Sequence, residues 1–159
     1  MSVTEYESIL DSAAALEAKG DCIDALNEYE RAIDANHERA EAYLEAAKML
    51  LRHDGIWKGS KQIIGAERAV QYLTDALSWD KSNLSALELL FHAEMHVGEL
   101  HRAVQTASRL IDLSPDKQHW REQGRRTFAS LQQVPNGMRL LAWSVGSEGI
   151  NGLRKKFGE

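Results

Sequence analysis

Small and large apolar residues alternate at helical spacing between residues 19 and 47. A helix is expected to end at Gly20 in this stretch, and two further helices follow it. The apolar positions of these two helices recur every three or four residues, and they are Ala25, Tyr29, Ala32, Tyr43, Ala46 and Ala47. Residues at that spacing share one face of a helix, so the stretch predicts consecutive amphipathic helices.

The same pattern returns twice further along the chain. An alanine, a large apolar residue and another alanine stand at positions 25, 29 and 32 and again at 69, 73 and 76, and positions 103, 107 and 110 hold an altered version. The first offset is 44 residues and the second is 34. On the preceding helices Ile9, Tyr43 and Leu87 are separated by 34 and then by 44 residues. Both series fit a 34-residue unit present three times, with a 10-residue insertion inside the second copy.

A helix–turn–helix unit of this length and alternation resembles the tetratricopeptide repeat (TPR) family. The resemblance extends over roughly residues 6–117 and implies an all-α, right-handed superhelical TPR solenoid of three helix-turn-helix repeats. The repeats are expected at about 6–39, 40–83 and 84–117, with the insertion at 53–65. The inward positions of the family are matched here by Ile9, Ser12, Ala13, Leu16, Ala25, Tyr29, Ala32, Tyr43, Ala46, Ala47, Leu50, Ala69, Leu73, Ala76, Leu87, Leu90, Phe91, Glu94, Ala103, Ala107, Leu110 and Pro115.

The third unit departs from the family pattern. Phe91 stands where a small residue is usual, and Ala107 stands where a large one is usual. An exchange of volume within one packing layer would account for both residues. Glu94 has no such explanation. Trp79, in the second unit, occupies a position that is normally apolar and is expected in the core.

Sequence signals mark the ends of the expected helices. Thr4 with Glu7, and Ser85 with Glu88, predict capping boxes at two helix N-termini. The glycines at positions 20 and 98 predict left-handed caps at two C-termini. The Ser-Pro pair at 114 and 115 predicts a cap and a first-turn proline before a last helix.

That last helix is expected at about 116–133 and would serve as a capping helix. Trp120, Phe128 and Leu131 share one of its faces and would cover the end of the third unit, since an open end would expose core. The TPR domain would then span residues 1–134. Residues 135–159 form a short, expected helical tail with five glycines. The tail could pack as extra cap helices, enter an acidic groove of its own or of a neighbouring copy, or meet a membrane or another partner.

Charge is distributed unevenly along the chain. Residues 1–53 carry 5 Lys and Arg against 12 Asp and Glu, whereas residues 118–159 carry 7 against 3. A nucleic-acid reader needs a basic face on its folded body, so the acidic body argues against that class. The basic tail is suited to an acidic surface, including a surface of this protein, so self-association through residues 135–159 is a possible outcome.

Other bulk properties narrow the class of protein further. The 159 residues contain one cysteine, Cys22, so no disulfide within the chain is expected. The start of the chain lacks a signal-peptide pattern, and no apolar run approaches the ~18 residues of a membrane span. A soluble, cytoplasmic protein without a cofactor is expected. Cys22 has no catalytic partner pattern around it, so no catalytic residue is assigned.

The resemblance implies a binding groove lined by the first helix of each repeat. The matching positions are Glu7, Leu10, Ala14, Glu17, Glu41, Leu44, Lys48, Leu51, Ser85, Glu88, His92, Met95 and His96. These positions would be apolar along the middle and mostly acidic around it, which favours a peptide or amphipathic helix with basic flanks. The Lys, Asn and Arg clamp by which some family members hold the C-terminal tail of a heat-shock chaperone is absent. We therefore expect a non-catalytic adaptor or scaffold for protein–protein interaction.

Two alternatives accompany this expectation. The chain could be a secretion-type chaperone with three TPRs, a class of similar length and acidity. It could also be a metal-binding or hydrolytic protein that uses Glu88, His92 and His96, which lie four residues apart, although Ala93 replaces the glutamate of the zinc-protease motif. Trp57, in the insertion, is expected either to pack on the neighbouring helix or to anchor a partner.

Overall fold

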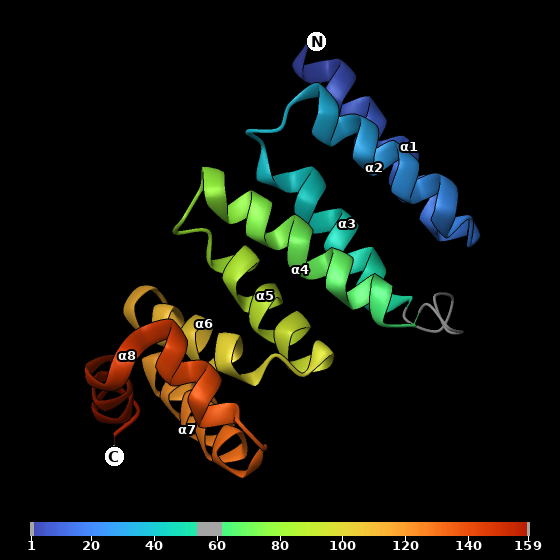
Figure 1. The fold of residues 1–159 in the computed structure, drawn as a ribbon. Coiled ribbons are helices and arrows are strands. Elements are labelled where there is room, and N and C mark those ends of the chain that lie inside the picture. The colour runs from blue at the N-terminus through green and yellow to red at the C-terminus, as the bar shows by residue number, and fades with distance from the viewer. Residues whose placement is uncertain (1, 54–61, 159) are drawn as a thin grey trace. The chain divides into compact units, whose positions relative to one another are not determined.

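The computed structural model describes residues 2–53 and 62–158, and this part of the chain is all-α (Figure 1). The helices that it contains are α1 (Val3–Lys19), α2 (Cys22–Ala35), α3 (Ala40–Arg52), α4 (Gln62–Trp79), α5 (Leu84–Val97), α6 (Leu100–Leu113), α7 (Lys117–Gln133) and α8 (Gly137–Lys156). Helices that follow one another in the chain pack antiparallel, an arrangement consistent with a helical repeat. The structure forms two compact units, Met1–Leu89 and Leu90–Glu159, and the division falls inside α5. No helix in the described ranges has both the length and the hydrophobicity needed to cross a membrane.

Unit Met1–Leu89 contains two antiparallel helix pairs, α1 with α2 and α3 with α4, and α2 also packs on α3. Most of the predicted inward positions are buried, which confirms the helical pattern. The buried ones in this unit are Ala13, Ala25, Tyr29, Ala32, Tyr43, Ala46, Ala47, Leu50, Ala69, Leu73, Ala76 and Leu87. Ser12 is exposed instead. Trp79 is 51% exposed and lies against the ring of His37, so the expectation that it belongs to the core is wrong.

The end of α1 is the left-handed turn that the sequence predicts. Gly20 has φ +88°, and its N–H donates to the carbonyl of Glu17. The N–H of Asp21 donates to the carbonyl of Leu16, which completes a Schellman motif. Gly98 ends α5 in the same way with φ +87°. Both turns let the chain reverse at once, so each following helix can pack back on its predecessor.

The predicted capping boxes at positions 4/7 and 85/88 are wrong, because suitable caps stand two residues earlier in both cases. At α1 the hydroxyl of Ser2 accepts from the N–H of Glu5, whose carboxylate accepts from the N–H of Ser2. At α5 the side chain of Asn83 accepts from the N–H of Ala86 at 3.0 Å. Ser85 therefore lies inside the helix.

Unit Leu90–Glu159 is built from the second part of α5 together with α6, α7 and α8. Phe91 and Ala107 are both buried, as the predicted exchange of volume requires, and the Phe91 ring meets Trp120 edge-on at 5.3 Å. Helix α7 matches the expected range of 116–133. Its cap, however, is Asp116, whose carboxylate accepts from the N–H of His119, while Ser114 ends α6.

The tail forms α8, which packs on α6 and α7 of its own unit. Leu141, Leu153 and Phe157 are buried there, so the tail acts as an additional covering helix. The helix bends at Gly146, where φ is +73° and the backbone is not helical. This bend directs both halves of α8 onto the unit.

Basic residues on α7 and α8 make hydrogen bonds, ion pairs and ring contacts within this unit. The guanidinium of Arg125 donates to the carbonyl of Phe157 at 3.0 Å, and Lys156 pairs with Asp112 at 2.7 Å. Arg154 lies 5.7 Å from the centroid of the Phe128 ring. The Phe157 ring sits directly on Gly124 of α7, where an added Cβ would lie 2.2 Å from ring carbon Cε1. The missing side chain at this position is thus what allows the ring to dock.

We predict that Gly124→Ala displaces Phe157 and loosens the end of α8. Overpacking of a close contact usually destabilises by about 1–3 kcal/mol. Amide hydrogen exchange should show faster exchange in residues 147–158, with smaller changes elsewhere. Gly152→Ala is the matched control, because an added Cβ there has nothing within 4 Å and should leave exchange unchanged or slower. Equal effects of the two substitutions would refute the role of Gly124.

Candidate partner-binding surface

The predicted groove residues occupy α1, α3 and α5. The structure brings the members on α1 and α3 together, and these are Glu7, Leu10, Ala14, Glu17, Glu41, Leu44, Lys48 and Leu51. We call this set the α1–α3 face. All of its residues are partly or fully accessible to solvent, whereas most of the inward positions on the same two helices are buried. The predicted division between core and accessible face is confirmed on α3, where every predicted inward position is buried. On α1 only Ala13 is buried, Ile9 and Leu16 are half-buried, and Ser12 is exposed.

The first link between α1 and α3 joins their N-terminal ends. The hydroxyl of Tyr6 on α1 accepts from the N–H of Ala42, in the first turn of α3, at 3.2 Å. The residue before α3, Arg39, provides no side-chain cap, so Tyr6 satisfies one of the unpaired N–H groups of that helix. The Arg39 guanidinium in turn lies 4.2 Å from the centroid of the Tyr6 ring. Leu10 is partly buried and packs against the apolar cluster of Tyr6, Ala32 and Ala42.

The second link joins the C-terminal ends of the two helices. The Glu17 carboxylate accepts two short hydrogen bonds from Arg52, at 2.8 and 3.0 Å, and lies 3.1 Å from a ring nitrogen of His53. It also accepts a longer bond from the hydroxyl of Tyr29 on α2. Burial, together with the Glu17 charge, raises the pKa of Tyr29 to about 12, so its phenol stays protonated. Glu17 is only 12% exposed and connects three helices.

These two links fix the geometry of the α1–α3 face. Because N-terminal end meets N-terminal end and C-terminal end meets C-terminal end, α1 and α3 run side by side in the same direction (Figure 1). The residues linked across them are 36 and 35 positions apart, close to the 34-residue period. Leu10, Leu44 and Leu51 are half-buried on these helices, between the two polar links in sequence. The face thus has an apolar middle and tied ends.

Several charges of the face are already matched inside the chain. Glu41 pairs with Arg39 at 3.0 Å, and this hydrogen bond holds the pKa of the Glu41 carboxyl below its usual value. Lys48 pairs with Glu45 at 2.7 Å. Exposed pairs of this kind contribute only about 0–1 kcal/mol each, so a ligand can replace them at little cost. The face is consequently less acidic in effect than its sequence indicates.

The groove residues on α5 are divided between the two units. Ser85 and Glu88 belong to the first unit, and His92, Met95 and His96 belong to the second. The His92 ring lies 5.6 Å from that of Phe91. Among the described residues, which include those of α5, no three His, Cys, Asp or Glu side chains are close enough together to hold a metal ion.

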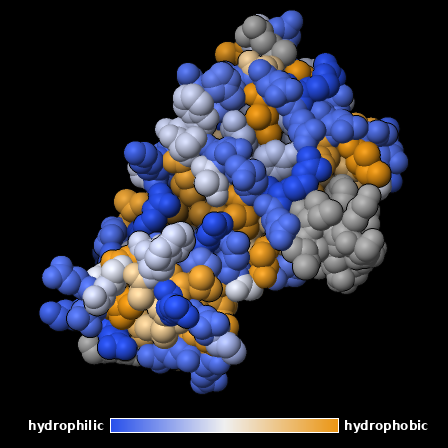
Figure 2. Space-filling model, viewed as in Figure 1, coloured by the Kyte–Doolittle hydropathy of each residue, from blue (hydrophilic) through white to orange (hydrophobic). Residues whose placement is uncertain are grey.

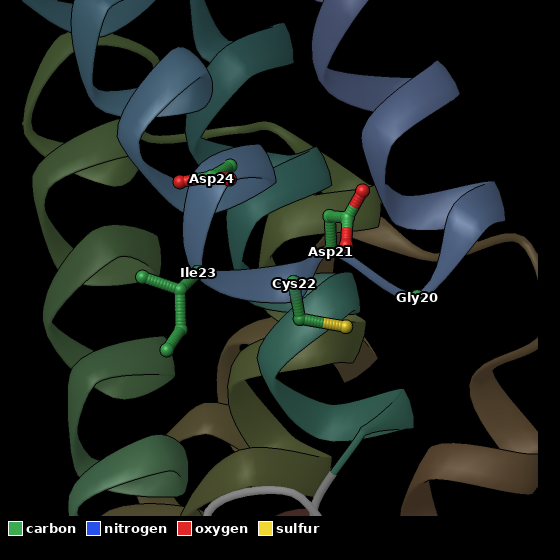
Figure 3. Close-up of a pocket in the computed structure, with 5 residues that line it drawn as sticks. All are labelled: Gly20, Asp21, Cys22, Ile23 and Asp24. Atoms are coloured by element: carbon green, nitrogen blue, oxygen red, sulfur yellow. The ribbon is translucent and has the colours of Figure 1, made fainter.

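Two further candidates from the sequence have different outcomes. Trp57 lies outside the described residues. Cys22 is buried at the start of α2, next to a hollow of about 360 Å³ whose described lining is residues 20–24 (Figure 3). Burial raises the pKa of the Cys22 thiol, and the carboxylates of Glu17 and Asp21 raise it further. A protonated thiol is a poor nucleophile, so the setting does not favour chemistry at Cys22.

Glu94 is an inward position at which the sequence offers no reason for a charged residue, and the structure supplies one. Glu94 on α5 is 4% exposed, and its carboxylate accepts from the hydroxyl of Thr106 on α6 at 2.7 Å. Burial raises the pKa of Glu94 to about 7, although the Thr106 hydrogen bond and the charges of Arg102 and Arg109 oppose the shift. The family pattern marks the glutamate as exceptional, but only the folded chain shows its partner.

Comparisons with known proteins leave the family open. No family model matches the chain, and no curated protein is significantly similar to it in sequence. The structure by itself establishes an all-helical chain whose eight helices in the described ranges pack sequentially and antiparallel.

We predict that Glu94→Gln stabilises the protein at alkaline but not at acidic pH. The folded-state pKa lies above the ordinary value of 4.5, so the cost of burial is absent below pH 4.5 and grows until about pH 7. The shift corresponds to roughly 3 kcal/mol at most, so at pH 8 the variant should gain on the order of 1–3 kcal/mol. Urea unfolding at pH 4 and pH 8 measures this difference.

The exposed Glu148→Gln on α8 is the control and should show no comparable pH-dependent gain. A Glu94→Gln variant with the same pH profile as the parent protein would show that the buried carboxyl carries no such cost.

Proposed function

We propose that the chain is built from three TPR units arranged as a right-handed solenoid within residues 1–134. Three features support this: the buried alanines recur with the repeat, α1 and α3 run in parallel about one period apart, and Gly20 and Gly98 end helices in the same left-handed turn. Parallel first helices are what stacked helix hairpins produce. The expected cytoplasmic location belongs to the same proposal.

On this basis the protein is a non-catalytic adaptor that binds a peptide or an amphipathic helix. The observation that carries the proposal is the accessible α1–α3 face, with Leu10, Leu44 and Leu51 on two helices held side by side. A helix laid into an apolar groove binds through side chains at intervals of three and four residues. Ser85 and Glu88 on α5, which belong to the same unit, would extend this surface.

The charge of the face indicates the chemistry of the ligand. Glu7, Glu41 and Glu88 are exposed, and among the predicted groove positions only Lys48 is a lysine or arginine. Basic flanks on the ligand would compete with Arg39 for Glu41, and Glu45 would keep Lys48 occupied. The apolar contacts supply most of the binding energy, since burial contributes about 25 cal/mol per Å².

We predict that Leu44→Asp abolishes binding to the natural partner while the helix content is retained. A carboxylate in the middle of the face would have to be desolvated without a partner, which costs several kcal/mol and lowers affinity more than 100-fold. Partners captured by the parent protein are identified, expressed separately and titrated against each variant by calorimetry.

The matched control is Leu113→Asp, the same substitution at an accessible leucine on α6, outside the proposed face. It should leave affinity unchanged. Leu10→Ser provides a second, milder test, with circular dichroism as the check on folding. Binding that survives Leu44→Asp, or that is lost in Leu113→Asp alone, would contradict the assignment of the face.

A further inference from the structure

A second surface, on α8, carries apolar side chains that nothing in its own unit covers. Trp143 is 89% exposed, Leu140 one turn before it is 46% exposed, and Arg139 beside them is also exposed. We call these three residues the Trp143 face. Figure 2 shows apolar side chains at the surface where α8 lies. Exposed aromatic side chains that cluster with other apolar ones commonly mark protein interaction sites.

The structure explains why the other apolar residues of α8 are covered and these are not. Leu141, Leu153 and Phe157 face α6 and α7 and are buried. Leu140 and Trp143 lie three positions apart and share the opposite side of the helix. Nothing in the packing of α8 onto its unit requires a tryptophan at position 143, so its large ring is free for contact with another molecule.

The net charges of the two units indicate what kind of molecule would contact Trp143. Unit Met1–Leu89 contains 9 Lys and Arg against 17 Asp and Glu, a balance of −8, whereas unit Leu90–Glu159 contains 10 against 7, a balance of +3. The acidic unit also exposes apolar side chains. Ile23 on α2 is 65% exposed, and Asp24 follows it directly, whereas Asp21 lies beyond Cys22 (Figure 3). An apolar side chain with a carboxylate beside it complements an apolar pair with an arginine beside it.

We propose that the Trp143 face docks on the α1–α2 surface around Ile23 of a second copy of this chain. Contact between Trp143 and Ile23 would bury the two most exposed large apolar side chains of the described residues, and Arg139 would approach Asp24. The contact is heterologous, because it joins two different surfaces. A symmetric contact of α8 with α8 would instead place two Arg139 side chains together.

A membrane surface is a weaker occupant for the same face. Anionic lipid attracts clusters of free basic residues, each contributing about 1 kcal/mol. Lys156 is paired with Asp112, Arg154 lies on Phe128, and Arg125 caps the end of α8. The basic residues of this region are therefore largely occupied within the unit.

The test uses the full chain and two single variants, each at an exposed position. Trp143→Ser removes the docking side chain, and Ile23→Lys places a positive charge where Arg139 would approach. Sedimentation equilibrium over a concentration series should show self-association of the parent protein, weakened at least tenfold in either variant and by added salt. Leu113→Ser, at an accessible leucine of α6, is the control and should associate like the parent.

Mixing the two variants then distinguishes the geometry. A heterologous contact needs Ile23 from one copy and Trp143 from the other, so the mixture should form a 1:1 complex although each variant alone associates at least tenfold more weakly than the parent. Three results would overturn the proposal: a parent protein that stays monomeric, association that survives Ile23→Lys, or binding of the monomer to phosphatidylserine vesicles that Trp143→Ser abolishes. Circular dichroism of both variants establishes that they are folded.

Discussion

Alanine at the contact points between neighbouring helices sets the architecture of this protein. Ala25, Ala32, Ala47, Ala69 and Ala103 are all completely buried. Small side chains let two helices approach closely, and the larger residues between them, such as Tyr29 and Leu73, then fill the remaining space. Close antiparallel pairs with short turns follow from this constraint, and the turns need glycine where the chain reverses.

The polar links between α1 and α3 add a second level of order. They lie toward the ends of the two helices, where Tyr6 meets Ala42 and Glu17 meets Arg52. Such links hold the helices in register without covering the residues between them. The apolar middle of the α1–α3 face therefore stays accessible in a chain whose other large apolar residues are mostly buried. This combination of rigid helices and an uncovered apolar strip is the physical basis for proposing a binding role.

The sequence predicts the parts of the structure that depend on local pattern, and it misses those that depend on distant residues. The spacing of Ala25, Tyr29 and Ala32 predicts the buried side of α2, and Gly20 predicts the end of α1. The N-terminal caps of α1 and α5 were misplaced by two residues because several serines, threonines and asparagines compete as caps. The docking of Phe157 on Gly124 could not be predicted, since it joins residues 33 positions apart in sequence through a missing side chain.

The same division applies to the candidate site. Periodicity separated accessible Leu44 and Leu51 from the buried positions of α3, because inward and outward positions alternate regularly on a helix. On α1 it did not, since Leu10 and the predicted inward residue Ile9 are equally half-buried. Periodicity also predicts that Glu17 contacts a ligand. In the structure the Glu17 carboxylate is hydrogen-bonded to Arg52, His53 and Tyr29. Ion pairs between helices depend on side-chain reach across the fold, which a one-dimensional pattern does not contain. Glu94 differs again: its position was recognised as exceptional, and its hydrogen bond to Thr106 supplies the reason it is tolerated.

Nuclear Overhauser measurements are the most direct test of whether α1 and α3 lie side by side in the same direction. If they do, cross-peaks join the ring protons of Tyr6 to the amide proton of Ala42, and that amide exchanges slowly with solvent, although an N–H in the first turn of a helix is ordinarily unprotected. Helical chemical shifts for both segments without these cross-peaks, and with rapid exchange at Ala42, would contradict this arrangement.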